Sequence, residues 1–290
     1  MQNRICTAPN CGGCLNNNRY FNEKKPAAST AGFFFCTFAC MQLALDFGNS
    51  AVKAGIFDGR ELILVQTQKQ FSKTQLRLLL KHYAIERCMS CSVTKASVPL
   101  EKFFRENTTY RRLRSSTVLP IKNYYKTRNT LGMDRLANLM GARSFFPRKN
   151  VLVVSAGTCI TYDVLNAKGE YYGGNIAPGL DMRLKAMHTF TSRLPLVKKK
   201  FTSDLFGNTT KSSMLTGVLT GAFFEMSGFI QAYQARYKDI HVIITGGDAS
   251  FFAERFSGKA FKKEYKIFAL PHLVLYGLNE ILLANNASNS

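Results

Sequence analysis

Two glycine-centred turns, about 110 residues apart, carry the residues best suited to phosphate chemistry. Residues 43–50 read LALDFGNS and residues 151–158 read VLVVSAGT, so each turn follows an apolar run and precedes more β-prone sequence. A glycine at such a turn lets backbone N–H groups approach a ligand closely, since no Cβ intervenes. Asp46, at the end of the first run, has a carboxylate that suits a divalent cation bridging phosphate oxygens. The repetition indicates a duplicated fold that closes on a nucleotide.

A second candidate for chemistry is the segment 131–135, which reads LGMDR at the start of a predicted helix. One interpretation makes Asp134 a general base that orients and deprotonates a hydroxyl, work that typically contributes about 10²–10⁴-fold to a rate. Arg135 then holds an anionic group of the acceptor. The structural alternative is a helix-start Asp, favoured there by the helix dipole, beside a surface Arg. The residues by themselves leave both open.

Nucleotide-binding and hydrolase signatures of other folds are missing from the sequence. It contains no G-x-x-x-x-G-K-[ST] loop and no G-x-G-x-x-G fingerprint. It also contains no G-x-S-x-G elbow and no H-E-x-x-H pair. The duplicated turns therefore remain the candidate phosphate site. Residues 245–247 (TGG), between a predicted strand and a helix, either contact an adenosine or form a tight turn.

The elements that position these residues alternate between strand-like and helix-like segments, which is typical of the α/β class. Strands are predicted at 42–47, 52–57, 61–67, 87–93, 118–121, 151–165 and 241–245. Helices are predicted at 74–83, 97–106, 134–146, 210–237, 248–256 and 272–284. The chain therefore divides near residue 150. The half 41–150 contains the first phosphate turn, and the half 151–290 contains the second turn and the adenosine turn.

Residues 1–40 do not read as a domain, because they lack periodicity and are rich in Asn, Cys and Gly. Lys24 and Lys25, the apolar run 32–36 and Cys40 loosely resemble an export signal. The simpler interpretation is an upstream extension, with functional sequence starting at Met41. Two C-x-x-C pairs, 11/14 and 88/91, are too far apart for a compact zinc site. The second pair is predicted to lie in the core.

Composition is that of an ordinary globular protein except for a net charge of +21. The charge indicates an anionic partner: nucleic acid, an acidic membrane surface or a phosphorylated small molecule. Basic clusters occur at 111–114, 198–200 and 262–263, and a solvated loop is the favoured interpretation of each. No run of about 18 uninterrupted apolar residues occurs, so we expect no membrane-spanning helix and no membrane partner.

The combination of motifs resembles the type III pantothenate kinases of the sugar kinase–actin superfamily, over residues 41 to about 284. The motifs that carry the resemblance are 46–50 (DFGNS), 131–135 (LGMDR), 156–163 (AGTCITYD), 173–179 (GGNIAPG) and 245–247 (TGG). The resemblance implies duplicated ribonuclease-H-like domains of the actin and sugar-kinase type, with mixed β-sheets flanked by helices. It implies transfer of the ATP γ-phosphoryl group to pantothenate, giving 4′-phosphopantothenate, the first step of coenzyme A biosynthesis.

The resemblance also implies roles for individual residues. The ATP-binding residues are Asp46, Phe47, Gly48, Asn49, Ser50, Ala51, Val52, Lys53 and Thr158, and Asp46 also positions Mg²⁺. Asp134 is the catalytic base, and the pantothenate-binding residues are Tyr125, Gly132, Met133, Asp134, Arg135 and Thr210. For Thr210 the structural alternative is a helix cap, and for Tyr125 a core aromatic. The resemblance further implies a homodimer in which the neighbouring subunit completes the acceptor pocket.

The second turn departs from the family at Ser155, where an Asp associated with a monovalent cation is usual. A neutral serine oxygen is a weaker ligand, so we expect less dependence on K⁺ or NH₄⁺. Arg128 also stands where a proline is frequent. Our leading hypothesis is a cytoplasmic, Mg²⁺-dependent pantothenate kinase. The alternatives are a non-catalytic regulatory relative that binds nucleic acid or a transcription partner, and a kinase for another small hydroxyl acceptor.

Overall fold

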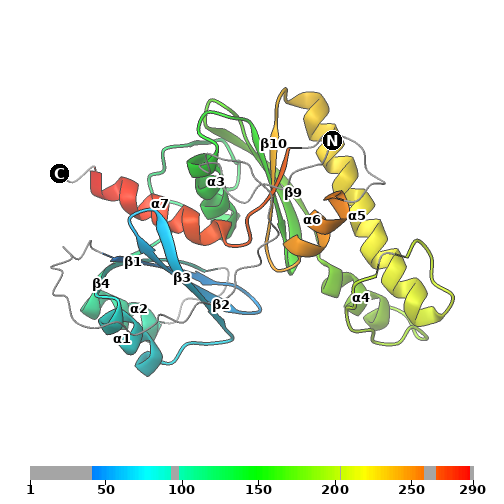
Figure 1. Cartoon of the computed structure of the whole chain (residues 1–290), viewed down its shortest axis with the longest axis horizontal. Coiled ribbons are helices and arrows are strands. Elements are labelled where there is room, and N and C mark those ends of the chain that lie inside the picture. Colours follow the sequence, from blue (N-terminus) through cyan, green and yellow to red (C-terminus); the bar gives the residue numbers. More distant parts are fainter. Residues whose placement is uncertain (1–40, 93–97, 203, 258–265, 288–290) are drawn as a thin grey trace, which may run out of the picture.

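The computed structural model describes residues 41–92, 98–202, 204–257 and 266–287, and shows two β-sheets interleaved with helices (Figure 1). The leader 1–40, its cysteines and the basic pair 262–263 lie outside these ranges. In the first half the elements are β1 (Met41–Phe47), β2 (Val52–Asp58), β3 (Glu61–Gln68), α1 (Lys73–His82), β4 (Ile85–Ser92), α2 (Val98–Asn107), β5 (Thr109–Arg112), β6 (Lys122–Asn123), η1 (Arg128–Thr130) and α3 (Met133–Phe145). In the second half they are β7 (Val151–Ala156), β8 (Cys159–Leu165), β9 (Glu170–Pro178), α4 (Leu180–Thr189), α5 (Thr210–Arg236), β10 (His241–Thr245), α6 (Ala249–Ser257), β11 (Ile267–Ala269) and α7 (Leu273–Ala287).

The two sheets repeat one topology, which confirms the predicted duplication and the α/β fold class. The first has the order β3-β2-β1-β4-β5, and the second has the order β11-β10-β7-β8-β9 with β6 added at its edge. In each, an antiparallel meander leads to a central strand, β1 or β7, whose other neighbour is parallel to it. Both phosphate turns therefore join the central strand to the next strand of the meander.

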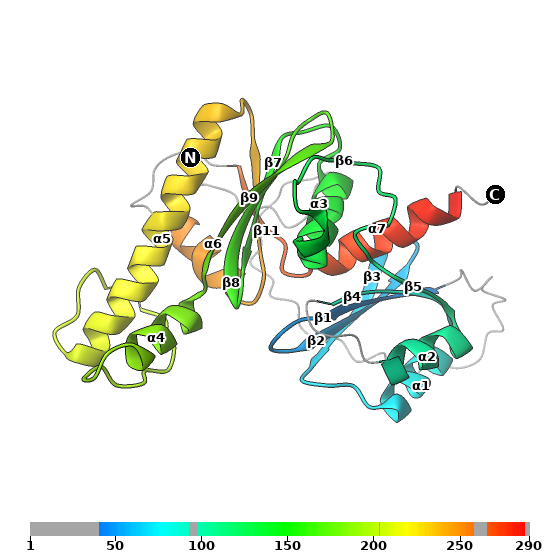
Figure 2. The same cartoon turned by 180° about the vertical axis from the view of Figure 1, so that it is seen from behind.

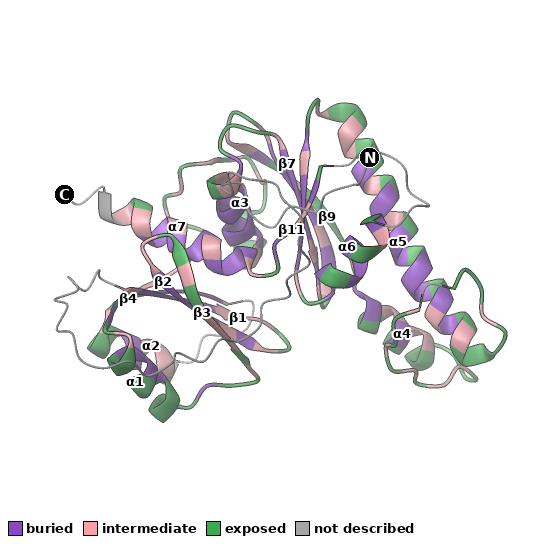
Figure 3. Ribbon diagram, viewed as in Figure 1, coloured by how far each residue is buried: buried purple, intermediate pink, exposed green. Residues whose placement is uncertain are grey.

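Helices and sheets alternate in five layers, with helices on both faces of each sheet. Figures 1 and 2 show this arrangement from opposite sides. The first sheet packs one face on α1 and α2 through a core that includes Leu43, Leu76 and Phe104. Its other face packs on α3 and α7. These two helices also cover the second sheet, whose remaining face is covered by α4, α5 and α6. Helices α3 and α7 are thus the layer common to both halves, and Figure 3 shows buried residues along these helices and along α5.

Two glycines allow the close crossing of α3 and α7. A Cβ on Gly277 would lie 1.7 Å from the Ala137 carbonyl oxygen, and one on Gly141 would lie 2.5 Å from the Leu273 carbonyl oxygen. Neither position has room for any side chain, since such distances are far inside van der Waals contact. The start of α3, which carries Asp134, is therefore set by the same packing that joins the halves.

Most predicted elements are present, but several others were missed. β5, β9, β11 and α4 were not predicted, and the strand expected at 118–121 lies instead at β6. β9 contains two adjacent glycines and ends in a proline, both of which are depleted in strands. The N-cap of α4 is Gly179, which offers no side-chain cap. The missed strands form because neighbouring strands pair with them, and α4 forms because its apolar residues pack in the core. Local propensity favours neither β9 nor α4.

Among the described residues, α5 has the length and apolar composition of a membrane-spanning helix, which differs from the expectation that none would. Its buried residues include Leu219, Phe223 and Ile230, which pack in the core against the second sheet. A core helix of this kind passes the same compositional test, so the finding is weak evidence for a membrane segment.

Candidate active site

The first phosphate turn is a tight connection between β1 and β2. The Gly48 N–H donates to the Ala51 carbonyl at 3.1 Å, and Asn49 and Ser50 are exposed at its tip. Asp46 lies opposite Lys53 in the antiparallel register of the two strands. Of the remaining predicted residues, Phe47 is half-buried and Val52 is buried. The turn therefore presents an open backbone loop flanked by one carboxylate and one ammonium group.

The second phosphate turn is held by two further glycine-containing segments. Thr158 is exposed at the tip, and the Gly157 N–H donates to the Cys159 carbonyl at 3.0 Å. A Cβ on Gly179 would lie 2.1 Å from the Gly157 carbonyl oxygen. Gly246, at a φ of +96°, approaches so closely that a Cβ would lie 2.2 Å from the Ala156 carbonyl oxygen. Segment 245–247 is thus a tight turn packed directly against the phosphate turn.

Asp134 lies in the first turn of α3, two residues after the N-cap Gly132. A Cβ on Gly132 would come within 2.5 Å of Asp134 Oδ1, so only glycine leaves room for this carboxylate position. Met133 begins the helix and is partly buried against both inner cores. The glycine of the LGMDR segment therefore has a defined steric role beside the candidate base.

Asp46 and Asp134, which belong to different sequence motifs, lie close enough for their carboxylates to interact electrostatically. Burial raises the pKa of Asp46, and the negative charge of Asp134 raises it further. Lys53 and a hydrogen bond from Cys91 oppose that rise. Burial likewise raises the pKa of Asp134, and the charge of Asp163 adds to it, whereas the Arg135 N–H and guanidinium lower it. A raised pKa suits a carboxylate that must accept a proton.

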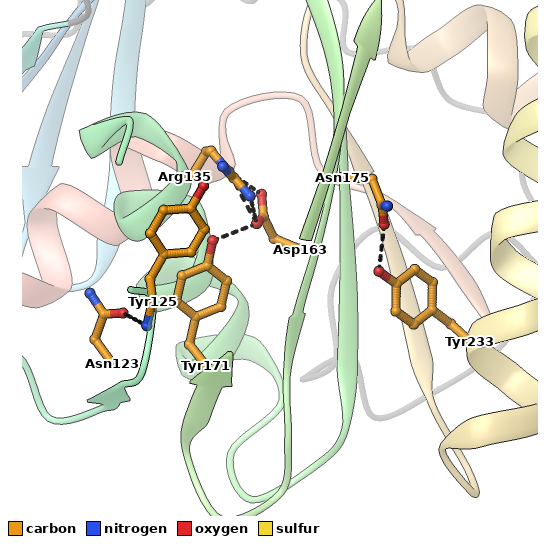
Figure 4. Close-up of polar contacts among 7 residues, drawn as sticks. All are labelled: Asn123, Tyr125, Arg135, Asp163, Tyr171, Asn175 and Tyr233. Atoms are coloured by element: carbon orange, nitrogen blue, oxygen red, sulfur yellow. Dashed lines mark hydrogen bonds and ion pairs between the residues drawn. The ribbon is translucent and has the colours of Figure 1, made fainter. Parts of the chain in front are cut away.

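Arg135 is not a surface residue, which excludes the structural alternative considered for it. It is 4% exposed, and its Nε and Nη2 atoms donate to the Asp163 carboxylate at distances of 2.6–3.1 Å (Figure 4). The Tyr125 ring lies 5.6 Å from the Arg135 guanidinium carbon and stacks on the ring of Tyr171. The pKa of Arg135 is raised by Asp163 despite the opposing effect of burial.

Asp163 and Tyr171 were missed as members of this network. Asp163 lies within a quoted motif but 28 residues from Arg135, and Tyr171 lies on the strand that was not predicted. The available signal was the position of Asp163 within a strand-like run of apolar residues. A carboxylate buried in such a strand needs a charged or hydrogen-bonding partner. Nothing in the spacing indicates which cation that partner is.

Thr210 lies apart from this centre within the chain, whereas Ser155 lies beside the second phosphate turn. Thr210 is the first residue of α5 and is exposed, and the capping box belongs to Thr209 with Ser212, so Thr210 is not the helix cap. It lines a shallow depression of about 570 Å³ with Met187 and Leu194. Helix α5 begins beside α4, and both views place that end across the second sheet from α3. Ser155 lies on β7, in register with Thr245 of β10.

The donor set available for a cation is small. Within the described ranges, no group of three or more His, Cys, Asp or Glu side chains is arranged to hold a metal ion. Asp46, with Asp134 nearby, fits a Mg²⁺ ion whose other ligands are phosphate oxygens and water, the usual arrangement in kinases. Cys88 and Cys91 are buried, as predicted for core residues.

Comparison with known proteins decides the family. The model of the type III pantothenate kinase family matches residues 42–232. The chain belongs to the type III pantothenate kinase family. It is 40% identical over 247 residues to the type III pantothenate kinase of Phocaeicola vulgatus, covering 85% of this chain and 99% of that protein. It is also 40% identical over 248 residues to that of Cytophaga hutchinsonii, covering 84% and 100%.

Solved structures support the fold. A Campylobacter jejuni protein described as a Baf family transcriptional activator superposes with a TM-score of 0.54 at 20% identity, covering 84% of this chain and 99% of that one. At that identity the likeness concerns the fold alone. As a member of the type III pantothenate kinases, the protein is an ATP-dependent kinase that phosphorylates pantothenate, a step of coenzyme A biosynthesis. The expectation of a kinase is confirmed, and the regulatory alternative is not favoured.

Proposed function

We propose that pantothenate phosphorylation takes place where the first phosphate turn meets the start of α3. The observation that carries this proposal is the electrostatic interaction of two partly buried carboxylates, Asp46 of β1 and Asp134 of α3, which come from different sequence motifs of the first half. Residues 46–53 and Thr158 bind the ATP phosphates through the two turns. Asp46 holds Mg²⁺, which neutralises phosphate charge when bound.

Asp134 acts as the general base for the transfer. It accepts the proton of the pantothenate primary hydroxyl while that oxygen forms a bond to the γ-phosphorus, and the bond from phosphorus to the β,γ-bridging oxygen breaks to release ADP. Such transfers depend mainly on positioning and charge neutralisation, so one base and oriented N–H groups are sufficient. Tyr125, Gly132, Met133 and Arg135 bind the acceptor beside Asp134.

The position of Thr210 supports a homodimer. If Thr210 contacts pantothenate, it does so in a neighbouring subunit, because within one chain α5 begins across the second sheet from α3, the helix that carries Asp134. We place the enzyme in the cytoplasm, where ATP is available. At Ser155 a neutral hydroxyl offers less to K⁺ or NH₄⁺ than a carboxylate, so dependence on those ions is weak.

The test is ADP release from Mg²⁺-ATP with and without pantothenate, for wild type and Asp134→Asn. Pantothenate-dependent release that falls by about 10²–10⁴-fold in the variant supports the assigned base. Equal turnover by the two proteins contradicts it. Release that requires another hydroxyl acceptor contradicts the assigned pantothenate-binding residues.

A further inference from the structure

The Arg135 guanidinium is held by a buried carboxylate that the proposed mechanism does not use. Nε donates to Asp163 at 3.1 and 3.0 Å, and Nη2 donates at 2.6 Å. The two side chains are 5% and 2% exposed. The Tyr171 hydroxyl donates to the same carboxylate at 2.8 Å. Helix α3 is thereby tied, one residue after Asp134, to strands β8 and β9 (Figure 4).

The glycine pair of the second half makes room for this network. A Cβ on Gly174 would lie 2.7 Å from Asp163 Oδ1 and 1.9 Å from the Tyr162 carbonyl oxygen. A Cβ on Gly173, whose φ is +130°, would lie 3.3 Å from the Tyr125 ring. The backbone of β9 is therefore shaped to admit the Asp163 carboxylate and the aromatic ring next to Arg135.

A buried guanidinium is stable only beside a carboxylate, and two carboxylates, those of Asp163 and Asp134, are near that of Arg135. Asp163 takes the guanidinium, while Asp134 is the neighbouring residue and is coupled electrostatically to Arg135. An arginine without Asp163 would pair with Asp134, because an unpaired buried charge is strongly unfavourable. A base paired in this way is stabilised in its ionised form and accepts a proton less readily.

We propose that Asp163, supported by Tyr171, is a positioning residue for phosphoryl transfer. It holds the Arg135 guanidinium away from Asp134 and so leaves that carboxylate available to the acceptor hydroxyl. This inference deepens the proposed function and rests on the role given there to Asp134.

The charges around Asp134 determine the sign of the expected effect. Asp46 faces it from β1, Cys91 from β4 and Asp163 from β8, and Arg135 lies on the same helix. Replacing Asp163 by Asn removes a negative charge and leaves the guanidinium uncompensated. Both changes lower the pKa of Asp134.

The first experiment is the dependence of kcat/KM for pantothenate on pH in Asp163→Asn. We expect kcat to fall on the order of 10²-fold, as when a reacting group is misplaced. We expect an unchanged KM for ATP and an acidic limb displaced to lower pH. A folded variant with wild-type kcat, or with a lower kcat and an undisplaced limb, overturns the proposal. The second result would show a merely structural role.

A matched pair of milder variants keeps the test decisive if Asp163→Asn does not fold. Tyr171→Phe removes the hydroxyl that supports Asp163, whereas Tyr162→Phe removes a hydroxyl that donates to Glu225 at 3.2 Å on the opposite face of β8. Both tyrosines are fully buried. We expect only Tyr171→Phe to lower kcat. Equal kcat losses in the two variants overturn the proposal.

Asp134→Asn is assayed in parallel, so that the two ideas fail separately. If that variant keeps wild-type turnover, the base assignment is wrong and this inference falls with it. If it is inactive while Asp163→Asn and Tyr171→Phe behave as wild type, the base assignment stands and the role of Asp163 alone is overturned.

Discussion

Cys91 donates its thiol hydrogen to the carboxylate of Asp46, with Sγ and Oδ1 3.4 Å apart. The two residues are direct neighbours in the parallel register of β1 and β4. Cys91 is fully buried, and burial raises the pKa of its thiol well above the ordinary value, so it remains a neutral donor. A residue predicted only to fill the core therefore also contacts the carboxylate proposed to hold Mg²⁺.

Cys91→Ala is expected to weaken the interaction with Mg²⁺. The substitution removes one hydrogen bond, worth about 0.5–1.5 kcal/mol, from the ligand that we assign to the metal. We expect a several-fold rise in the Mg²⁺ concentration that gives half-maximal rate, measured at saturating ATP. Cys91→Ser, which keeps a donor of similar size, is the control. Equal behaviour of the two variants would show that the thiol has no part in holding Asp46.

Asp134→Asn is expected to stabilise the fold while removing activity. The folded-state pKa of Asp134 is raised, mainly by burial, so the fold binds its proton more tightly than the unfolded chain does. The stabilisation from this bound proton is fully present below the ordinary Asp pKa of 3.8, and it is lost as the pH rises through the raised pKa of the folded state. Urea unfolding should therefore show a gain for the variant at pH 7 that shrinks toward acidic pH. A gain that does not change with pH would contradict the shifted carboxylate.

Gly277→Ala is expected to destabilise the protein and displace α3. Its Cβ would lie 1.7 Å from the Ala137 carbonyl oxygen, so the helices must separate. Overpacking of this kind typically costs about 1–3 kcal/mol in the free energy of unfolding. Gly221→Ala on α5 is the matched control, because nothing lies within 4 Å of its Cβ position. For that variant we expect a small increase in the free energy of unfolding measured with urea, since alanine favours helix more than glycine does. An unchanged free energy of unfolding for Gly277→Ala would contradict the close crossing of α3 and α7.

Mixing two inactive variants tests whether the neighbouring subunit supplies Thr210. In a mixed dimer of Asp134→Asn and Thr210→Ala, one site receives both wild-type residues. We expect recovery to about a quarter of the wild-type rate after subunit exchange at equal amounts, because half of the dimers are mixed and half of their sites are intact. Steady-state assays before and after exchange measure it. No recovery, despite exchange confirmed by a tag on one variant, would place both residues in the same chain's site.

Ser155→Asp is expected to introduce a response to monovalent cations. A carboxylate at this position attracts K⁺ or NH₄⁺, whereas the present hydroxyl is neutral. Initial rates in K⁺, in NH₄⁺ and in a large inert cation should differ little for the wild type and strongly for the variant. A large loss of wild-type rate in the inert cation would contradict the weak dependence proposed here.

The sequence by itself determined the features that depend on local chemistry. Apolar runs followed by glycine predicted both phosphate turns, and the helical spacing of apolar residues predicted α3. The order of five short motifs indicated the family, and the comparisons confirmed it. Turn geometry and strand or helix periodicity are encoded within a few neighbouring residues, so they can be read without a structure.

Only the tertiary structure decided which distant residues meet. The pairing of Arg135 with Asp163 depends on the crossing of α3 over the second sheet. The contact between Cys91 and Asp46 depends on the parallel register of two strands 45 residues apart. Strand β9 forms despite weak local propensity because β8 and β6 pair with it, and helix α4 forms because Leu180 and Leu184 are buried in the core against the second sheet. Long-range register and packing arise from the summed contacts of the whole core, which no short segment of sequence contains.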